Sequence, residues 1–141
     1  MKLYLDTSIL VSALTSEVET PRMQEWLVAQ DDQETAISDW VITEFSAALS
    51  MKLRTGQIDQ DIRARALAAF ADITMESVTV LAVEQRHFRA AARIADQAAL
   101  GARGGDALHL AVCADYGARL CTLDRRLAAA APQLGVDAAL I

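Results

Sequence analysis

The sequence predicts an α/β fold in which a short central parallel sheet is flanked by helices. Short apolar segments that suit strands alternate along the chain with longer segments whose apolar residues recur at helical spacing. This order is typical of parallel strands joined by helices that cover both faces of the sheet. The chain has 141 residues, the usual size of one domain, and shows no repeat, linker or low-complexity tract. We therefore expect residues 1–141 to form a single domain.

The elements follow from apolar spacing and from the residues that begin and end helices. Thr20 with Pro21, Ser38 and Asp59 are suited to start helices, while Gly117 is suited to end one. We expect strands over residues 2–5, 35–37, 78–81, 119–123 and 136–141. We expect helices over residues 7–15, 21–30, 39–54, 60–71, 83–98, 106–116 and 125–131, the last broken by Pro132.

Charge and composition exclude several classes of protein. The net charge of −6 argues against a protein that coats nucleic acid by bulk attraction. No apolar run approaches the roughly 20 residues that span a bilayer, and the first residues suit a strand better than a signal peptide. Cys113 and Cys121 are too few for a disulfide framework, so we expect reduced core residues and a cytoplasmic location without membrane association.

Four acidic residues lie next to apolar segments, where an isolated carboxylate is costly. Asp6 and Asp124 each follow a predicted strand, Asp106 opens a predicted helix, and Glu44 lies among apolar neighbours in another helix. The carboxyl ends of parallel strands share one edge of a sheet, which is where ligands bind. We therefore expect the four carboxylates to meet there and to bind divalent cations. Oxygen ligands with few histidines favour Mg²⁺ or Mn²⁺ over Zn²⁺.

Each of these residues also has a simpler interpretation. Asp6 and Asp124 are suited to be turn or N-cap residues, Asp106 to be a first-turn acid, and Glu44 to form a buried ion pair. His109, one turn beyond Asp106, is expected to pack or to hydrogen-bond locally, since no other residue supports a zinc site.

His87 is expected to lie on the surface.

Four segments of the chain resemble the motifs of PIN domains, and their order and spacing look most like the VapC toxins of toxin–antitoxin pairs. The resemblance covers essentially the whole chain and rests on Asp6-Thr7-Ser8-Ile9-Leu10, Thr43-Glu44-Phe45, Arg103-Gly104-Gly105-Asp106-Ala107-Leu108-His109-Leu110-Ala111 and Thr122-Leu123-Asp124-Arg125-Arg126-Leu127. The resemblance implies a PIN-like nuclease domain that acts as a Mg²⁺- or Mn²⁺-dependent endoribonuclease. It also implies a VapB-type antitoxin as partner, and all four acidic positions of the family are filled.

The residues next to the acids have roles that fit this chemistry. Thr7, Ser8 and Thr122 are suited to hydrogen-bond the carboxylates and to fix their rotamers. Arg103 could hold a phosphate of the RNA substrate, or serve as a helix-cap or antitoxin contact. The apolar, alanine-rich helices at 40–51 and 62–71 suggest a two-fold homodimer.

Three other functions remain open on the sequence alone. Within the same family, a housekeeping RNA-processing nuclease is the nearest alternative. A magnesium-dependent phosphoryl-transfer protein also uses a strand-end aspartate, but Asp6 has no second aspartate two positions on and no strand-end lysine is evident. A non-catalytic interaction module could use the acids to bind a basic peptide.

Overall fold

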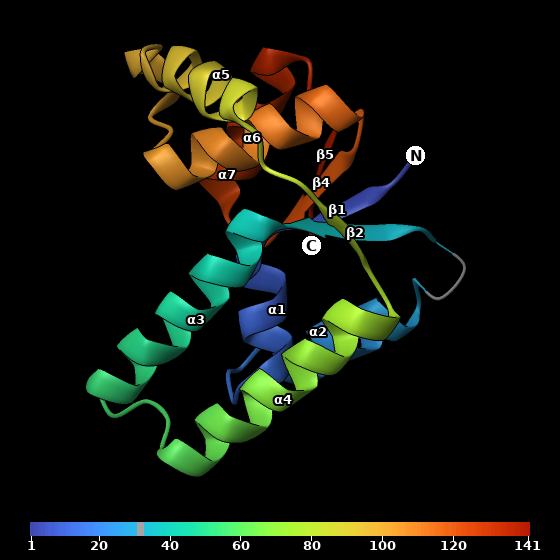
Figure 1. Ribbon diagram of the computed structural model, residues 1–141, viewed down its shortest axis with the longest axis vertical. Coiled ribbons are helices and arrows are strands. Elements are labelled where there is room, and N and C mark those ends of the chain that lie inside the picture. The colour runs from blue at the N-terminus through green and yellow to red at the C-terminus, as the bar shows by residue number, and fades with distance from the viewer. Residues whose placement is uncertain (31–32) are drawn as a thin grey trace.

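The computed structural model describes residues 1–30 and 33–141 and has the α/β architecture that the sequence predicts (Figure 1). Five parallel strands form one sheet in the order β3-β2-β1-β4-β5. The strands are β1 (Leu3–Leu5), β2 (Thr35–Ser38), β3 (Thr79–Leu81), β4 (Arg119–Thr122) and β5 (Ala138–Leu140). The central position of β1 explains its three consecutive buried residues, because a central parallel strand is covered on both faces.

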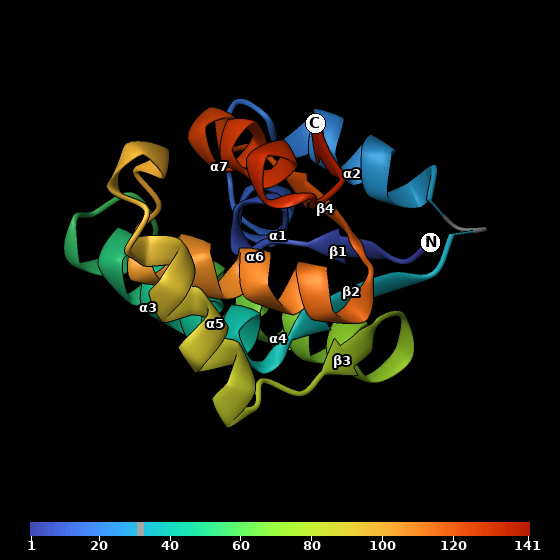
Figure 2. The same ribbon diagram turned by 90° about the horizontal axis from the view of Figure 1, so that it is seen from above.

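Helices cover both faces of the sheet. They are α1 (Thr7–Leu14), α2 (Thr20–Val28), α3 (Asp39–Arg54), α4 (Gln60–Glu76), α5 (Gln85–Ala95), α6 (Gly104–Tyr116) and α7 (Arg125–Ala130), with short 3-10 helices at Ala98–Leu100 and Ala131–Leu134. Figure 1 shows α1 to α4 on one side of the strands and α5 to α7 on the other. Seen from above, α6 lies between α5 and α7 (Figure 2).

The main core lies between the sheet and the helices on both sides. Tyr4 and Leu5 of β1 are fully buried with Leu110 of α6. On the other side, Phe45 of α3 stacks on Phe70 of α4, with ring centroids 4.1 Å apart and planes at 21°. This aromatic pair holds together the two long helices that extend away from the sheet.

Several predicted helix ends are confirmed. The Asp59 carboxylate accepts a hydrogen bond from the backbone N–H of Ile62 at 2.8 Å and caps α4. Gly117 ends α6 with φ +63°, a left-handed conformation that favours glycine. Pro132 follows α7 and lies in the 3-10 helix that replaces further α-helix.

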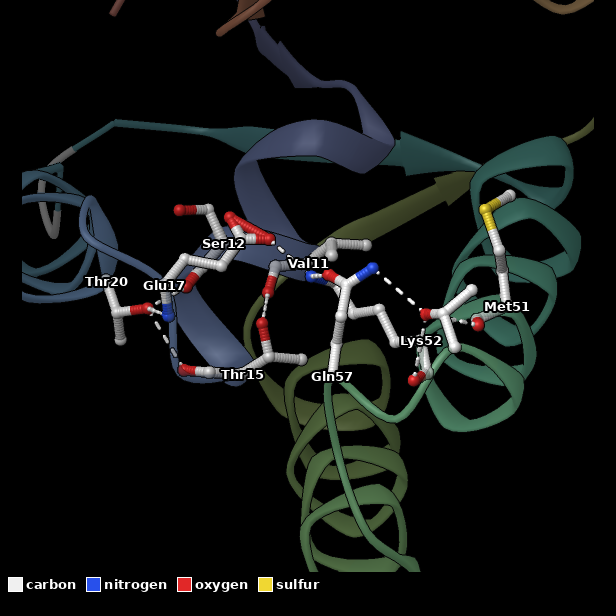
Figure 3. Close-up of polar contacts among 9 residues, drawn as sticks. Val11, Ser12, Thr15, Glu17, Thr20, Met51, Lys52 and Gln57 are labelled. Carbon is white, nitrogen blue, oxygen red and sulfur yellow. Dashed lines mark hydrogen bonds and ion pairs between the residues drawn. The ribbon is translucent and has the colours of Figure 1, made fainter.

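The predicted cap at Thr20 is wrong by one residue. Glu19 is the N-cap of α2, and the Thr20 hydroxyl instead lies 2.6 Å from the carbonyl oxygen of Ser12 and accepts from the backbone N–H of Glu17 (Figure 3). The Glu17 carboxylate in turn pairs with Lys52 of α3 at 2.9 Å. Thr20 therefore closes the turn between α1 and α2 instead of capping its own helix.

The predicted side-chain cap at Ser38 is also absent. Ser38 occupies the N-cap position of α3, but its hydroxyl forms no cap hydrogen bond and pairs with the Tyr4 hydroxyl at 2.8 Å instead. Other boundaries move by a few residues: α4 continues to Glu76, five residues beyond its predicted end, while α5 is shorter at both ends.

In the two described stretches, no helix is both long enough and apolar enough to span a membrane.

The aromatic stack between α3 and α4 leads to a stability prediction. Phe45→Ala removes a fully buried ring and leaves a cavity against Phe70, so it should lower the free energy of unfolding by about 3–5 kcal/mol. Met75→Ala, at a position of α4 that is 84% exposed, is the matched control and should change it little. Urea denaturation of both variants checks this, and equal midpoints would contradict the assigned packing.

Candidate metal-binding active site

Asp6 and Asp124 lie at the same edge of the sheet, at the carboxyl ends of neighbouring strands. Strands β1 and β4 are parallel partners, with Leu5 opposite Cys121. The backbone N–H of Asp6 continues this pairing by donating to the carbonyl oxygen of Cys121 at 3.1 Å. Asp124 lies two residues beyond the end of β4. The sheet register therefore brings together two residues from nearly opposite ends of the sequence.

Asp6 is buried, with 4% of its surface exposed, and hydrogen bonds fix its orientation. Its Oδ1 accepts from the backbone N–H and the hydroxyl of Ser8, at 3.0 and 2.5 Å, and from the N–H of Ile9. Its Oδ2 accepts from the Thr122 hydroxyl at 2.5 Å. Burial raises the pKa of Asp6, and these hydrogen bonds offset only part of the increase.

Glu44 approaches the same edge from α3, and its side chain remains 29% exposed. Its Oε1 accepts hydrogen bonds from the Thr7 hydroxyl at 2.7 Å and from His109 Nε2 at 2.5 Å. Partial burial acts to raise the pKa of Glu44, but the hydrogen bond and charge of His109, together with Thr7, outweigh it and lower the pKa. Thr7 therefore links Glu44 to the segment that carries Asp6.

His109 connects Glu44 to the interior through a chain of hydrogen bonds. Its Nδ1 lies 2.7 Å from the Tyr4 hydroxyl, which also pairs with the Ser38 hydroxyl. The Nε2–H of His109 donates to Glu44, while the directions of the hydrogen bonds among Nδ1, Tyr4 and Ser38 depend on whether Nδ1 carries a proton. His109 is packed in the interior as expected, but its hydrogen bonds are not local, because its partners lie on other elements.

Asp106 and Asp124 line a second part of the site, a pocket of about 240 Å³ that they share with Arg103 and Arg126. Asp106 Oδ2 accepts from the backbone N–H of Arg103 at 3.3 Å. Asp124 Oδ1 accepts from the backbone N–H groups of Arg126 and Leu127 at 2.8 and 3.2 Å, and so caps α7.

Three contacts bring the two parts of the site side by side. The Thr122 hydroxyl donates to Asp6 and accepts from the backbone N–H of Asp124 at 3.0 Å. The Ser8 hydroxyl accepts from the N–H of Leu123 at 3.1 Å. A Cβ at Gly105, the residue before Asp106, would lie only 3.0 Å from Glu44 Oε2. The start of α6 can pass this close to Glu44 because glycine has no side chain.

The four carboxylates fit a hard divalent cation in their chemistry. Asp106 and Asp124 each use one oxygen to accept backbone N–H groups, and both short hydrogen bonds of Glu44 fall on Oε1. Among the described residues, no hydrogen bond reaches the second oxygen of Asp106 or Asp124, and oxygen-only donors suit Mg²⁺ or Mn²⁺.

The carboxylates are not gathered around one point. Across residues 1–30 and 33–141, no three His, Cys, Asp or Glu side chains are in position to share one ion as they stand. Like charges without a cation between them repel. Asp106 and Asp124 are more exposed than Asp6, so their side chains have room to turn toward it.

The structural roles suggested for the acids, as helix caps and as an ion-pair partner, are also observed in part. Asp6 and Asp124 are both N-caps, of α1 and α7, and Glu44 has a histidine partner. A cap occupies the oxygen that faces the helix, so it fixes the carboxylate without using all its lone pairs.

The prediction that His87 lies on the surface is wrong. His87 is buried between α5 and α6, where Nδ1 accepts the backbone N–H of Glu84 and Nε2 pairs with Asp115, both at 2.8 Å.

Comparison with known proteins identifies the fold family. The sequence pattern that describes the PIN domain matches residues 3–132. No curated protein matches the sequence significantly. Among solved structures, VapBC2 from Rickettsia felis bound to a promoter DNA fragment has a TM-score of 0.72 at 16% identity, covering 99% of this chain and 98% of its own.

Two further structures have the same fold. VapC20 from Mycobacterium tuberculosis, described as a sarcin–ricin loop cleaving toxin, has a TM-score of 0.72 at 17% identity, with coverages of 91% and 94%. DNA-bound VapBC from Salmonella typhimurium has a TM-score of 0.71 at 17% identity, with coverages of 99% and 97%. At these identities, the similarity to solved structures concerns the fold alone. The sequence match over residues 3–132 shows the family: the protein belongs to the PIN domain family.

Proposed function

We propose that the chain is a divalent-metal-dependent endoribonuclease formed by one nuclease domain, residues 1–141, and the toxin of a VapBC-type toxin–antitoxin pair. One observation carries the proposal. Four carboxylates reach one edge of the sheet from four different elements, and most of their hydrogen bonds come from hydroxyls and backbone N–H groups rather than from lysine or arginine side chains. Carboxylates arranged in this way suit a cation as their partner.

Asp6, Glu44, Asp106 and Asp124 would hold Mg²⁺ or Mn²⁺ and are the proposed catalytic residues. Such an ion offsets the negative charge that develops on a reacting phosphodiester and lowers the pKa of a bound water. Thr7 fixes the rotamer of Glu44, while Ser8 and Thr122 fix that of Asp6. Arg103 is proposed to bind a substrate phosphate, because it lines the pocket between Asp106 and Asp124.

The relatives in structure support both proposed partners. VapC20 is described as a toxin that cleaves the sarcin–ricin loop, which favours RNA as the substrate class. The Rickettsia and Salmonella structures are VapBC complexes, which favours a VapB-type antitoxin. The antitoxin should offer an arginine or lysine to the acidic site, replacing the charge of the metal. An RNA substrate and two free, buried cysteines agree with the expected cytoplasmic location.

Amide variants test the metal site. Asp6→Asn, Glu44→Gln and Asp106→Asn keep the shape of each side chain but remove the charge that a hard cation needs, so each should abolish Mn²⁺-dependent cleavage of total bacterial RNA, with Asp124→Asn equal or slightly milder. Sequencing of RNA ends after brief induction in cells gives the cleaved RNA and the position of the cut.

Asp72→Asn is the matched control, since Asp72 is exposed on α4 away from the sheet edge, and it should cleave like the wild type. Asp106→Asn cleaving at the wild-type rate would show that the site assignment is wrong. Hydrolysis of acyl or sugar phosphates instead of RNA would favour a phosphoryl-transfer protein.

Metal should also stabilise the folded protein. Mn²⁺ binds the folded wild type, so it should raise the melting temperature, and it should do so much less for Asp106→Asn. Differential scanning calorimetry with chelator and with excess Mn²⁺ measures both effects. A melting temperature of the wild type that Mn²⁺ leaves unchanged would contradict a shared metal site.

The raised pKa of Asp6 makes stability depend on pH in a defined direction. The folded state holds this proton more tightly than the unfolded state, so in chelator the contribution of Asp6 destabilises as pH rises from about 4 through its folded pKa. Over that range, the unfolding free energy of Asp6→Asn should improve relative to the wild type by at most about 1.4 kcal/mol per pH unit. Urea denaturation across this pH range gives the difference, and a difference that is flat with pH would refute the shift.

We also propose a homodimer through the helices at 40–51 and 62–71. Ala47 and Met51 of α3 are exposed, Met51 by 55%, and an apolar patch on a helix suits a two-fold contact. Ala47→Glu should lower the mass measured by light scattering at tens of micromolar from dimer to monomer. Val18→Glu, at a position 95% exposed outside these helices, should not. A wild type that is strictly monomeric would rule out the dimer.

A further inference from the structure

Two arginines and two acids share the 240 Å³ pocket without pairing with one another. Arg103 and Arg126 line it together with Asp106 and Asp124. In the described part of the chain, no guanidinium nitrogen of either arginine forms a salt bridge with the carboxylate of Asp106 or Asp124. The positive charges are therefore available to a ligand, although acids stand next to them.

The loop before α6 holds the Arg126 guanidinium in place. Arg126 Nη2 donates to the carbonyl oxygen of Gly101 at 3.3 Å. A Cβ at Gly101 would lie 3.0 Å from the same Nη2, and Gly101 has φ +65°, which other residues rarely adopt. Glycine at this position therefore allows both the turn of the loop and the close approach of the arginine.

Charge explains why such an arginine is needed beside the acids. The chain carries a net charge of −6, so long-range attraction does not draw RNA to it. A phosphate that approaches Asp106 and Asp124 is repelled unless cations stand close by. Arg126 is exposed and reaches the pocket from α7, opposite Arg103, which precedes α6.

We infer that Arg126 is a substrate-positioning residue that binds a backbone phosphate of the RNA next to the one that is cleaved, with its guanidinium oriented by Gly101. The inference rests on the proposed ribonuclease function and adds a second cationic contact to that of Arg103. A planar guanidinium held at one nitrogen still presents its other donors to phosphate oxygens. The competing role is purely structural, in which Arg126 only ties α7 to the loop at Gly101.

Kinetics of Arg126→Ala separate the two roles, with Arg125→Ala as the matched control. Arg125 is the neighbouring residue, has the same charge and is exposed, but does not line the pocket. On the RNA that the wild type cleaves, Arg126→Ala should raise KM about tenfold with kcat nearly unchanged, as expected for one lost charge-assisted contact. Arg126→Lys should recover part of the loss, and Arg125→Ala should match the wild type.

The salt dependence of RNA binding separates the two roles, because a purely structural role of Arg126 would leave it unchanged. Binding of a fluorescein-labelled, mixed-sequence single-stranded RNA is followed by anisotropy in Ca²⁺ at several salt concentrations. For Arg126→Ala the slope of log K against log [salt] should become shallower by about 0.7, the value for one phosphate contact. Melting temperatures of the same variants report any loosening of the loop.

The outcomes are distinct. Equal KM values and equal salt slopes for Arg126→Ala and Arg125→Ala would overturn the inference. So would an Arg126→Ala variant whose melting temperature and kcat fall while the salt slope of its RNA binding stays unchanged. If the wild type cleaves no RNA but the slope still changes, the proposed function fails while the phosphate contact of Arg126 is supported.

Discussion

One chain of hydrogen bonds ties the candidate site to the core. It runs from Ser38 through Tyr4 and His109 to Glu44, and Thr7 completes it from α1. The five residues belong to β2, β1, α6, α3 and α1, so the sheet and the helices on both of its faces all contribute to it. Buried polar groups are costly when they lose a partner, so the position of each element depends on the others. Burial also raises the pKa of Tyr4 and keeps its hydroxyl neutral within the chain.

The site combines two tasks in the same side chains. Asp6 and Asp124 begin helices α1 and α7 and also point to the edge of the sheet. The cap gives each carboxylate a fixed direction, which a metal ligand needs and which a flexible surface acid does not have. The fold therefore orients these acids through ordinary helix starts, with threonine and serine hydroxyls adding the remaining hydrogen bonds.

Local patterns in the sequence were sufficient for the order of the elements and for the edge at which the acids lie. Asp59 and Gly117 act as predicted because a helix cap depends on its immediate neighbours. Thr20 does not, because its hydroxyl bonds to groups that precede α2 instead of to its own helix. His87 does not, because α6 covers it and supplies Asp115 as its partner. His109 lies one turn beyond Asp106 on α6, but its contact with the site does not follow from local sequence, because its partner Glu44 is 65 positions away. Arg126 lies in the motif that contains Asp124, but the contact that orients it, with the carbonyl oxygen of Gly101 25 positions earlier, does not follow from the sequence.

The sheet order has a consequence for how the protein is made. The strand β1 lies in the middle of the sheet, and its partner β4 is synthesised only after β2 and β3. The contact between Asp6 and Thr122 joins residues 116 positions apart. During translation, β1, β2 and β3 emerge early, but the edge where the acids meet stays incomplete until β4 leaves the ribosome. A nascent chain therefore cannot bring the four acids together until β4 and Asp124 have left the ribosome and most of the sheet has formed.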